Sequence, residues 1–320
     1  MDSRPSVAII TPALASANNG NWHTASRWMR FLAARCRVHC AIRWDGGDAD
    51  LMIALHARRS AQSIAAFHRT GRPVVVVLTG TDLYRDIHDD ADAQASLAVA
   101  DRLVCLQERG PQALPEALRA RTRVVYQSAS RLGPLPARTR SVDLLLVGHV
   151  RAEKDPMTAV RALSLLEAPD WRLMQIGQVP DDALGHALRD AAARDPRLVL
   201  LGARAHRATR EHIRRARLLL LPSRIEGGAN VLIEAAMSDV PVLASRIDGS
   251  VGMLGDDYAG YFEPGDAAAL AALIRRCRDE PAFLAQLRAQ VRARSPRFEA
   301  SRERDAVRAL VAELTGPGAT

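Results

Sequence analysis

The 320-residue sequence predicts an α/β protein made of two doubly wound domains. Short β-branched runs alternate with helical stretches along the chain, and this alternation indicates parallel βαβ units. A segment at residues 131–141, rich in proline and arginine, interrupts the alternation and is the best linker candidate. The length also exceeds what one hydrophobic core comfortably serves.

The predicted elements define the domains. Strands before the linker are expected at residues 7–13, 38–42, 51–57, 74–80, 102–107 and 123–129, with a first helix over 24–35. Strands after the linker are expected at 142–148, 171–177, 197–202, 217–223 and 240–245, followed by helices over 266–280, 281–294 and 301–314. We therefore expect an N-terminal domain over 1–135 and a C-terminal domain over 140–298. A final helix at about 299–316 is expected to pack back on the N-terminal domain.

The composition excludes several classes of protein. No uncharged apolar stretch approaches the length of a membrane span, and the N-terminus lacks the pattern of a signal peptide, so we expect a cytoplasmic protein without a membrane partner. The four cysteines form no CxxC pair and are expected to be small buried hydrophobes. The net charge of +8 is spread along the chain, which favours anionic small molecules over nucleic acid as partners.

Rare residues mark the loops between strands and helices. Lys154 is the only lysine, and the only asparagines are Asn18, Asn19, Asn21 and Asn230. All of them lie in segments expected to join a strand to a helix. The first such loop lacks GxGxxG, and the chain has no Walker A sequence. Any nucleotide must therefore be bound by a different motif.

The segment EGGANVLIE runs from Glu226 to Glu234 and is expected to open a helix. Its glycines allow close approach of the backbone, and a helix start offers unpaired amides for a diphosphate. We place Glu226 in the loop and Glu234 about two turns into the helix, where each accepts hydrogen bonds from sugar hydroxyls. The alternative is that Glu226 only caps the helix and Glu234 is only solvated.

The segment GHVRAEKDP, residues 148–156, follows the first strand of the same domain. Lys154 is expected near the loop after this strand, where its point charge suits phosphate oxygens. A merely exposed lysine is the alternative.

Together these two segments resemble the C-terminal half of the GT-B glycosyltransferases of family 4, whose two Rossmann-like domains face a central cleft. The resemblance covers residues 143–266 by motif and implies that Lys154 binds diphosphate, Glu226 a hexose and Glu234 a ribose. His149 stands where the family has an arginine, so either Arg151 substitutes for it or His149 acts as a hydrogen-bond donor. The other donor-binding residues that the resemblance implies are Arg204, Gly227, Gly228, Asn230 and Val231.

Three polar segments at strand ends of the first half are expected to share one edge of a parallel sheet. They cover residues 18–28, 51–60 and 74–87 and bring arginines and histidines together, which suits an anionic acceptor. Taken singly, Thr81 or Asp82 serves equally well as a helix cap, and Arg58 and Arg59 as solvated side chains.

The strings NGNWHTA, LHARRS, LTGTDLYRDI and YQS resemble the selenosugar synthases of selenoneine biosynthesis, the SenB family. This resemblance implies transfer of a hexosyl group, typically N-acetylglucosamine, from a UDP-sugar to the selenium of selenophosphate, with release of UDP. It implies no metal, no cofactor, and functional coupling to an enzyme that supplies selenophosphate. The implied acceptor residues are Gly20, Asn21, Trp22, His23, Arg58, Arg59, Thr79, Gly80 and Arg85, with His56, Thr81 and Asp82 as catalytic candidates.

Three other functions remain open from the sequence. A family 4-like glycosyltransferase with a hydroxyl acceptor would not depend on selenophosphate. A non-catalytic GT-B-like protein would be expected to lose Lys154, Glu226 and Glu234. A UDP-sugar epimerase needs acid–base carboxylates in the first half, where Asp82, Asp86 and Glu108 are available.

Overall fold

The computed structural model describes residues 4–15, 19–136, 142–167 and 170–316. The chain forms two compact units, one built from Met1–Gln127 and Ala300–Thr320 and the other from Ser128–Glu299. Each unit contains one six-stranded sheet, and all neighbouring strands are parallel. The alternation of strands and helices read from the sequence therefore produces one parallel sheet in each half.

The first sheet has the strand order β2-β1-β3-β4-β5-β6. Its strands are β1 (Ser6–Ile10), β2 (Arg37–Ala41), β3 (Leu51–Leu55), β4 (Val74–Leu78), β5 (Arg102–Cys105) and β6 (Thr122–Val124). Its helices are α1 (Gly20–Leu32), α2 (Ala61–His68), α3 (Ile87–Asp89), α4 (Ala91–Val99), α5 (Glu116–Arg119) and α13 (Ala300–Thr315). Because β1 lies between β2 and β3, the winding reverses there. In open α/β sheets, ligands bind outside the carboxyl ends of strands at such a point.

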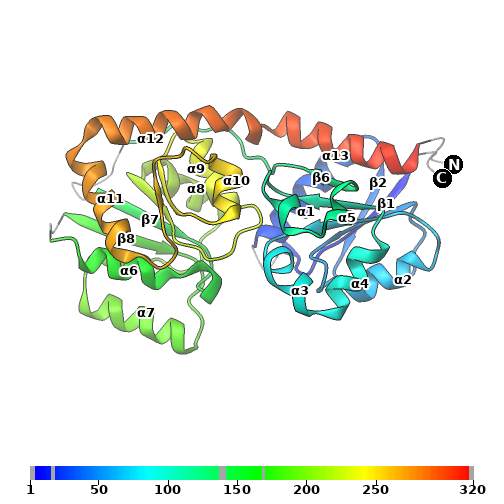
Figure 1. The fold of residues 1–320 in the computed structure, drawn as a ribbon, viewed down its shortest axis with the longest axis horizontal. Coiled ribbons are helices and arrows are strands. Elements are labelled where there is room, and N and C mark those ends of the chain that lie inside the picture. Colours follow the sequence, from blue (N-terminus) through cyan, green and yellow to red (C-terminus); the bar gives the residue numbers. More distant parts are fainter. Residues whose placement is uncertain (1–3, 16–18, 137–141, 168–169, 317–320) are drawn as a thin grey trace. The chain divides into compact units, whose positions relative to one another are not determined.

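Alternate residues of the strands in the first unit enter two different cores. Leu51, Ile53 and Leu55 of β3 pack with α1 and α13, whereas Met52 and Ala54 pack with α2 and α4. Figure 1 shows α1 and α13 on one face of this sheet and α2 and α4 on the other. Burial on both faces explains why β3 and β4 are continuous apolar runs in the sequence.

The C-terminal helix α13 packs against α1 through a buried carboxylate. Glu303, which is 1% exposed, accepts a hydrogen bond of 2.8 Å from Nε1 of Trp28 and one of 3.0 Å from Nε of Arg27. The indole N–H of Trp28 is fully buried, so this acceptor supplies the partner that a buried donor requires. The last helix of the chain is thus tied to the first unit.

The second sheet has the strand order β12-β11-β10-β7-β8-β9. Its strands are β7 (Val142–Val147), β8 (Trp171–Ile176), β9 (Leu198–Leu200), β10 (Leu218–Leu221), β11 (Val242–Ser245) and β12 (Tyr261–Phe262). Its helices are α6 (Pro156–Ser164), α7 (Ala183–Arg194), α8 (His206–Arg215), α9 (Asn230–Ala236), α10 (Asp248–Leu254), α11 (Ala267–Asp279) and α12 (Pro281–Arg294). The winding reverses between β7 and β10, which places the ligand-binding crevice of this unit at their carboxyl ends.

Three details differ from the sequence prediction. The helix expected over 24–35 begins at Gly20, because the side chain of Asn19 caps it by accepting a hydrogen bond of 3.1 Å from the backbone N–H of Trp22. The second unit begins at Ser128 and not near residue 140, because Leu132 and Leu135 hydrogen-bond to Met237 and Arg214 of that unit. Strand β12 was not expected, and at two residues it is too short to leave a periodic pattern.

The structure also bears on burial and membranes. Cys36, Cys105 and Cys277 are buried as expected, but Cys40 is only half-buried because it lies on the edge strand β2. Over the described ranges, none of the helices is long and apolar enough to cross a membrane. Asn18 and residues 137–141 of the expected linker lie outside the described part of the chain.

Candidate functional site

The loops after β7 and β10 carry the polar residues that the sequence singled out in the second half. Lys154 ends a short 3₁₀ turn over Ala152–Lys154 and so precedes helix α6, which begins at Pro156. Glu226 lies in the loop between β10 and α9. Both loops leave the sheet where its winding reverses, at the edge where a parallel sheet binds ligands.

Lys154 and Glu226 form an ion pair across these loops. The ammonium Nζ of Lys154 lies 2.7 Å from Oε1 and 2.9 Å from Oε2 of Glu226. Glu226 is buried, and its Oε1 also accepts a hydrogen bond of 2.6 Å from the hydroxyl of Ser223. The Lys154 side chain keeps 36% of its surface exposed. A positive group accessible to solvent is thus held in place by a buried carboxylate.

The residue after Lys154 has a strained backbone. Asp155 has φ 40° and ψ 56°, a left-handed conformation that costs a non-glycine residue about 1–2 kcal/mol. Its Oδ2 accepts a hydrogen bond of 2.9 Å from the Thr158 hydroxyl and lies 2.9 Å from a terminal nitrogen of Arg224. Arg224 also donates its backbone N–H to the carbonyl of Glu153 at 2.8 Å. These contacts tie the Lys154 turn to the loop after β10.

Glycines let three neighbouring loops approach through their backbones. Gly177, after β8, has φ 145°, and a Cβ built there would lie 2.0 Å from the carbonyl oxygen of Gly148 after β7. The N–H of Gly177 donates to the carbonyl of Gly202 at 3.0 Å. A side chain at Gly177 would therefore force these loops apart.

A hollow of about 900 Å³ opens beside these glycines. Its lining mixes apolar side chains with His149, Arg151, Asp182 and Arg189. The remaining lining residues are Val150, Ala152, Gln178, Val179, Pro180, Leu184, Leu200, Gly202 and Ala203. Nδ1 of His149 accepts a hydrogen bond of 3.1 Å from the backbone N–H of Gln178. This bond leaves the ring proton on Nε2, so His149 can donate to a ligand from that nitrogen.

The EGGANVLIE segment differs in one respect from its prediction. Helix α9 begins only at Asn230, so Glu234 lies about one turn into the helix and not two. Glu234 is buried, and its Oε1 lies 2.5 Å from Nε2 of His206, the first residue of α8. Gly227 and Gly228 precede the helix in the loop, and Val231 follows Asn230 in its first turn. Arg204 is exposed, two residues before α8.

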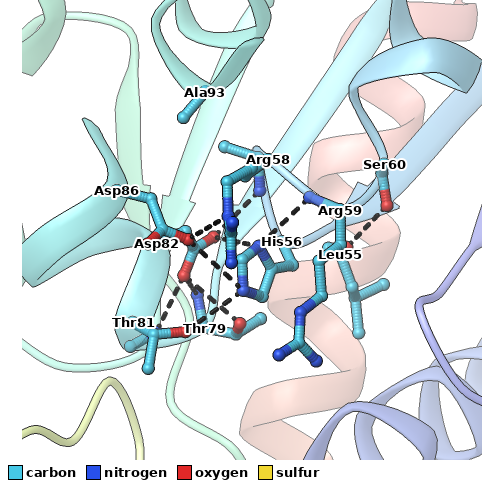
Figure 2. A network of polar contacts seen from close by, with 12 residues as sticks. Leu55, His56, Arg58, Arg59, Ser60, Thr79, Thr81, Asp82, Asp86 and Ala93 are labelled. Atoms are coloured by element: carbon cyan, nitrogen blue, oxygen red, sulfur yellow. Dashed lines mark hydrogen bonds and ion pairs between the residues drawn. The ribbon is translucent and has the colours of Figure 1, made fainter. Parts of the chain in front are cut away.

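The candidate residues of the first unit gather at the carboxyl ends of β3 and β4 around Asp82. Figure 2 shows the imidazole of His56 between Thr81, Asp82 and Asp86. Nε2 of His56 lies 3.1 Å from the hydroxyl of Thr81, and its Nδ1 accepts a 3.4 Å contact from the backbone N–H of Arg59. His56 is only 2% exposed, so its imidazole is enclosed by these neighbours.

Asp82 is fully buried and organises the backbone around it. It accepts hydrogen bonds from the backbone N–H groups of Ala57 at 2.9 Å, Thr79 at 2.8 Å and Gly80 at 3.0 Å. The following segment, Asp82–Asp86, is π-helical, a feature often found at functional sites. Asp82 therefore fixes the loops that present the other candidates.

The arginines expected to suit an anionic acceptor are partly paired with a carboxylate. Nε of Arg58 lies 2.9 Å from Oδ2 of Asp86, and Nε of Arg85 lies 3.1 Å from Oδ1 of the same carboxylate. Arg59 is exposed, and in Figure 2 its guanidinium extends away from the carboxylates. Asp86 therefore offsets part of the arginine charge, and Arg59 is the better candidate for an anionic ligand.

The residues 20–23, expected in a loop, form the first turn of α1. The side chains of Asn21, Trp22 and His23 are half-buried, and Gly20 is exposed. Because α1 follows β1 and His56 follows β3, both groups border the reversal of winding in the first sheet.

Burial lowers the pKa of His56. Asp82 and Asp86, at 3.9 and 3.8 Å, raise the pKa, and Arg59 and Arg58 lower it, but desolvation is the largest influence. The carboxylates already serve other donors, which limits their effect on the imidazole. His56 is consequently neutral near pH 7, with a donor N–H on Nε2.

This direction predicts a pH dependence of stability. An unfolded histidine titrates near about pH 6.5 and binds a proton more readily than buried His56, so the free energy of unfolding should fall as the pH drops below that value. Urea unfolding at pH 7.5 and 5.5 would measure the loss, which should shrink in His56→Gln. An equal loss in wild type and His56→Gln would contradict the prediction.

Within the residues that the structure describes, no cluster of three or more His, Cys, Asp or Glu side chains is placed to hold a metal ion.

Comparison with known proteins finds a family match within the second unit. Residues 141–280 match the family of glycosyl transferases group 1. The match lies within the second unit and covers less than half of the chain. The matched segment includes Lys154, Glu226, Glu234 and the hollow beside them. No match to a curated protein was found for the sequence.

Solved structures show the fold of the whole chain. HepE from Anabaena, in a structure with UDP and glucose, aligns with a TM-score of 0.79 over 97% of this chain and 100% of HepE, at 14% identity. Sucrose-phosphate synthase from Thermosynechococcus elongatus aligns with a TM-score of 0.76 over 97% and 98% of the two chains, at 17% identity. A glycosyltransferase from Rickettsia africae gives 0.73 over 99% and 100%, at 12% identity. These alignments confirm the GT-B fold with its two Rossmann-like sheets.

Several residues of the matched segment make contacts at the site that the sequence did not predict. Ser223 and Arg224 support Glu226 and Asp155, and His206 contacts Glu234. The proline after β10 and the start of α8 mark a loop and a helix, but neither predicts a contact between distant residues. Gln178, after β8, could have been suspected from its place at the same sheet edge.

Proposed function

We propose that this chain is a glycosyltransferase that binds a UDP-sugar at the carboxyl ends of β7 and β10. The observation that carries the proposal is the Lys154–Glu226 pair, presented beside a hollow large enough for a nucleotide within the segment that matches the group 1 family. Lys154 would bind the diphosphate, Glu226 the hexose and Glu234 the ribose. HepE, which shares the fold, is known in complex with UDP-glucose, and this supports the choice of donor.

The hollow supplies the remaining contacts of this proposal. The uracil would lie against Gly202 and Ala203, between the apolar side chains of Val179 and Leu200. His149 would donate a hydrogen bond from Nε2 to a phosphate oxygen, because its Nδ1 is held by Gln178. Arg151 is exposed at the same rim and would add positive charge. Backbone amides of Gly228, Asn230 and Val231 are further candidates for phosphate contacts.

For the acceptor we propose selenophosphate, as the sequence strings of the first half suggest. Its selenium would attack the anomeric carbon, so that a C–Se bond forms while the C–O bond to UDP breaks. The electron pair of that bond leaves on the β-phosphate oxygen, and the acceptor needs no deprotonation because it is already an anionic nucleophile. The enzyme must then bring two anions together and stabilise departing UDP. Exposed Arg59 supports this acceptor, with a supplying enzyme as the functional partner.

A hydroxyl acceptor is the competing form of the proposal, and the comparisons favour it. The matched proteins named above are described with UDP, glucose or sucrose phosphate and none with a selenium compound. The pairing of Arg58 and Arg85 with Asp86 also makes the first unit less cationic than an anionic acceptor would require.

One experiment separates these forms. The protein would be incubated with UDP-N-acetylglucosamine alone, with selenophosphate, or with a panel of sugar alcohols and phosphates, while UDP release and product mass are followed. Release that requires selenophosphate and gives a product with the isotope pattern of selenium supports the selenosugar reaction. Release that requires a hydroxyl acceptor assigns the alternative. Failure to bind UDP in calorimetry would overturn the UDP-sugar proposal itself.

A further inference from the structure

Glu234 is held by a histidine from a neighbouring helix. Nε2 of His206, at the start of α8, lies 2.5 Å from Oε1 of Glu234 on α9. A carboxylate can only accept, so the imidazole N–H donates. The two residues are 28 positions apart in the chain, and α8 packs against α9. The contact therefore comes from tertiary packing and not from local sequence.

The burial of the two partners is unequal. Glu234 is 8% exposed, whereas the His206 side chain keeps 49% of its surface exposed. One turn further along α8, Arg210 is buried and contributes positive charge near Glu234. Its guanidinium already donates to the carbonyl of Ser130 at 2.8 Å. His206 is therefore the donor from α8 that fixes the orientation of the Glu234 carboxylate.

The loop that leads into α8 borders the hollow. Gly202 and Ala203 line it, and His206 follows Ala203 by three residues. A nucleotide that places its base against Gly202 and Ala203 would direct its sugar toward the start of α8 and Glu234. With Oε1 committed to His206, the carboxylate can turn little, and Oε2 remains to accept from a sugar hydroxyl.

We propose that His206 is a positioning residue that makes Glu234 select ribonucleotide donors over deoxyribonucleotide donors. The inference rests on the proposed function, which assigns Glu234 to the ribose. A held carboxylate accepts a strong hydrogen bond from a 2′-hydroxyl, and a nucleotide that lacks this hydroxyl leaves one charged acceptor unpaired. Without His206 the carboxylate rotates, and the difference between the two nucleotides shrinks.

Calorimetric dissociation constants of UDP and 2′-deoxy-UDP would test this. Wild type should bind UDP more tightly by about 10- to 100-fold, as for one hydrogen bond to a charged group. His206→Ala should reduce the preference to within about threefold, and His206→Gln should retain most of it because the amide N–H still donates. For a UDP-sugar, His206→Ala should raise KM and change kcat little, since the contact is made equally before and during reaction.

Two further variants make the outcomes distinct. Arg207→Ala is the matched control, because this neighbour on the same helix is 95% exposed and should leave the preference unchanged. Glu234→Ala should lose the preference as His206→Ala does, because alanine has no acceptor for the 2′-hydroxyl. A full preference in His206→Ala together with its loss in Glu234→Ala would overturn the role of His206 and leave the proposed function standing. Equal binding of both nucleotides by wild type would overturn the ribose assignment of Glu234 and the inference with it.

Discussion

Replacing Asp82 with alanine should lower the free energy of unfolding by about 3–5 kcal/mol. The fully buried carboxylate accepts hydrogen bonds from the backbone N–H groups of Ala57, Thr79 and Gly80. Alanine leaves these three donors without their acceptor, and each buried unpaired donor costs about 1–3 kcal/mol. Partial access of water at the sheet edge keeps the total below the simple sum. Urea unfolding followed by circular dichroism would measure the change.

Asp82→Asn is the matched variant. Its amide oxygen can still accept at one position, while its NH₂ group would face a backbone donor, so an intermediate loss of about 2 kcal/mol is expected. At temperatures where Asp82→Ala remains folded, its affinity for UDP should equal that of wild type, because the donor residues belong to the second unit. A wild-type free energy of unfolding in Asp82→Ala would show that the loops after β3 and β4 do not depend on this carboxylate.

Elements with continuous apolar runs were predicted well from the sequence. Strands such as β3 and β4 are buried on both faces, so every residue in them is apolar and only their ends are uncertain. The error at α1 has a local cause. Asn19 was read as part of a loop, although its side chain caps the helix that begins at Gly20. An asparagine is common both in loops and at the N-cap of a helix. The sequence alone therefore does not say which place Asn19 has until the apolar face of the helix is assigned.

The donor-site candidates could be located because their types are rare in this chain and their loops follow strands. Lys154 and Glu226 lie 72 residues apart, and the order of β7 and β10 in the sheet brings them into contact. The order of strands in a sheet depends on the tertiary structure and cannot be read from the sequence. The sequence therefore predicted that both residues lie at the same edge of the sheet, but it did not predict their ion pair. The same limit applies to His206, which meets Glu234 only because α8 packs on α9.

The acceptor candidates show a different limit. The sequence places Arg58, Arg59 and Arg85 near one edge, and counting charges there suggested a strongly cationic site. Asp86 is buried between Arg58 and Arg85 and compensates them, whereas Arg59 extends away. Charges along a chain do not indicate which of them pair, because pairing depends on side-chain direction. A π-helical turn, which sets the directions of Arg85 and Asp86, has no sequence signature.

Lys154→Ala should weaken UDP binding and Glu226→Ala should not, although the two residues are partners. Removing Lys154 deletes a charge-assisted contact to the diphosphate, so the dissociation constant of UDP should rise about 10- to 100-fold. Removing Glu226 deletes the carboxylate that competes for the ammonium at 2.7 and 2.9 Å, so UDP should bind equally well or more tightly.

The reaction itself should respond differently from binding. If Glu226 holds the hexose, Glu226→Ala should lower kcat with the UDP-sugar by about 100-fold or more, because the sugar is no longer oriented for attack. Glu226→Gln keeps an acceptor for the Ser223 hydroxyl, which donates at 2.6 Å in the native protein, and so controls for collapse of the loop. Calorimetry with UDP and steady-state kinetics on these variants would measure both effects. Equal weakening of UDP binding in Lys154→Ala and Glu226→Ala would mean that the pair only maintains the loop. The exposed ammonium would then have no separate part in holding the diphosphate.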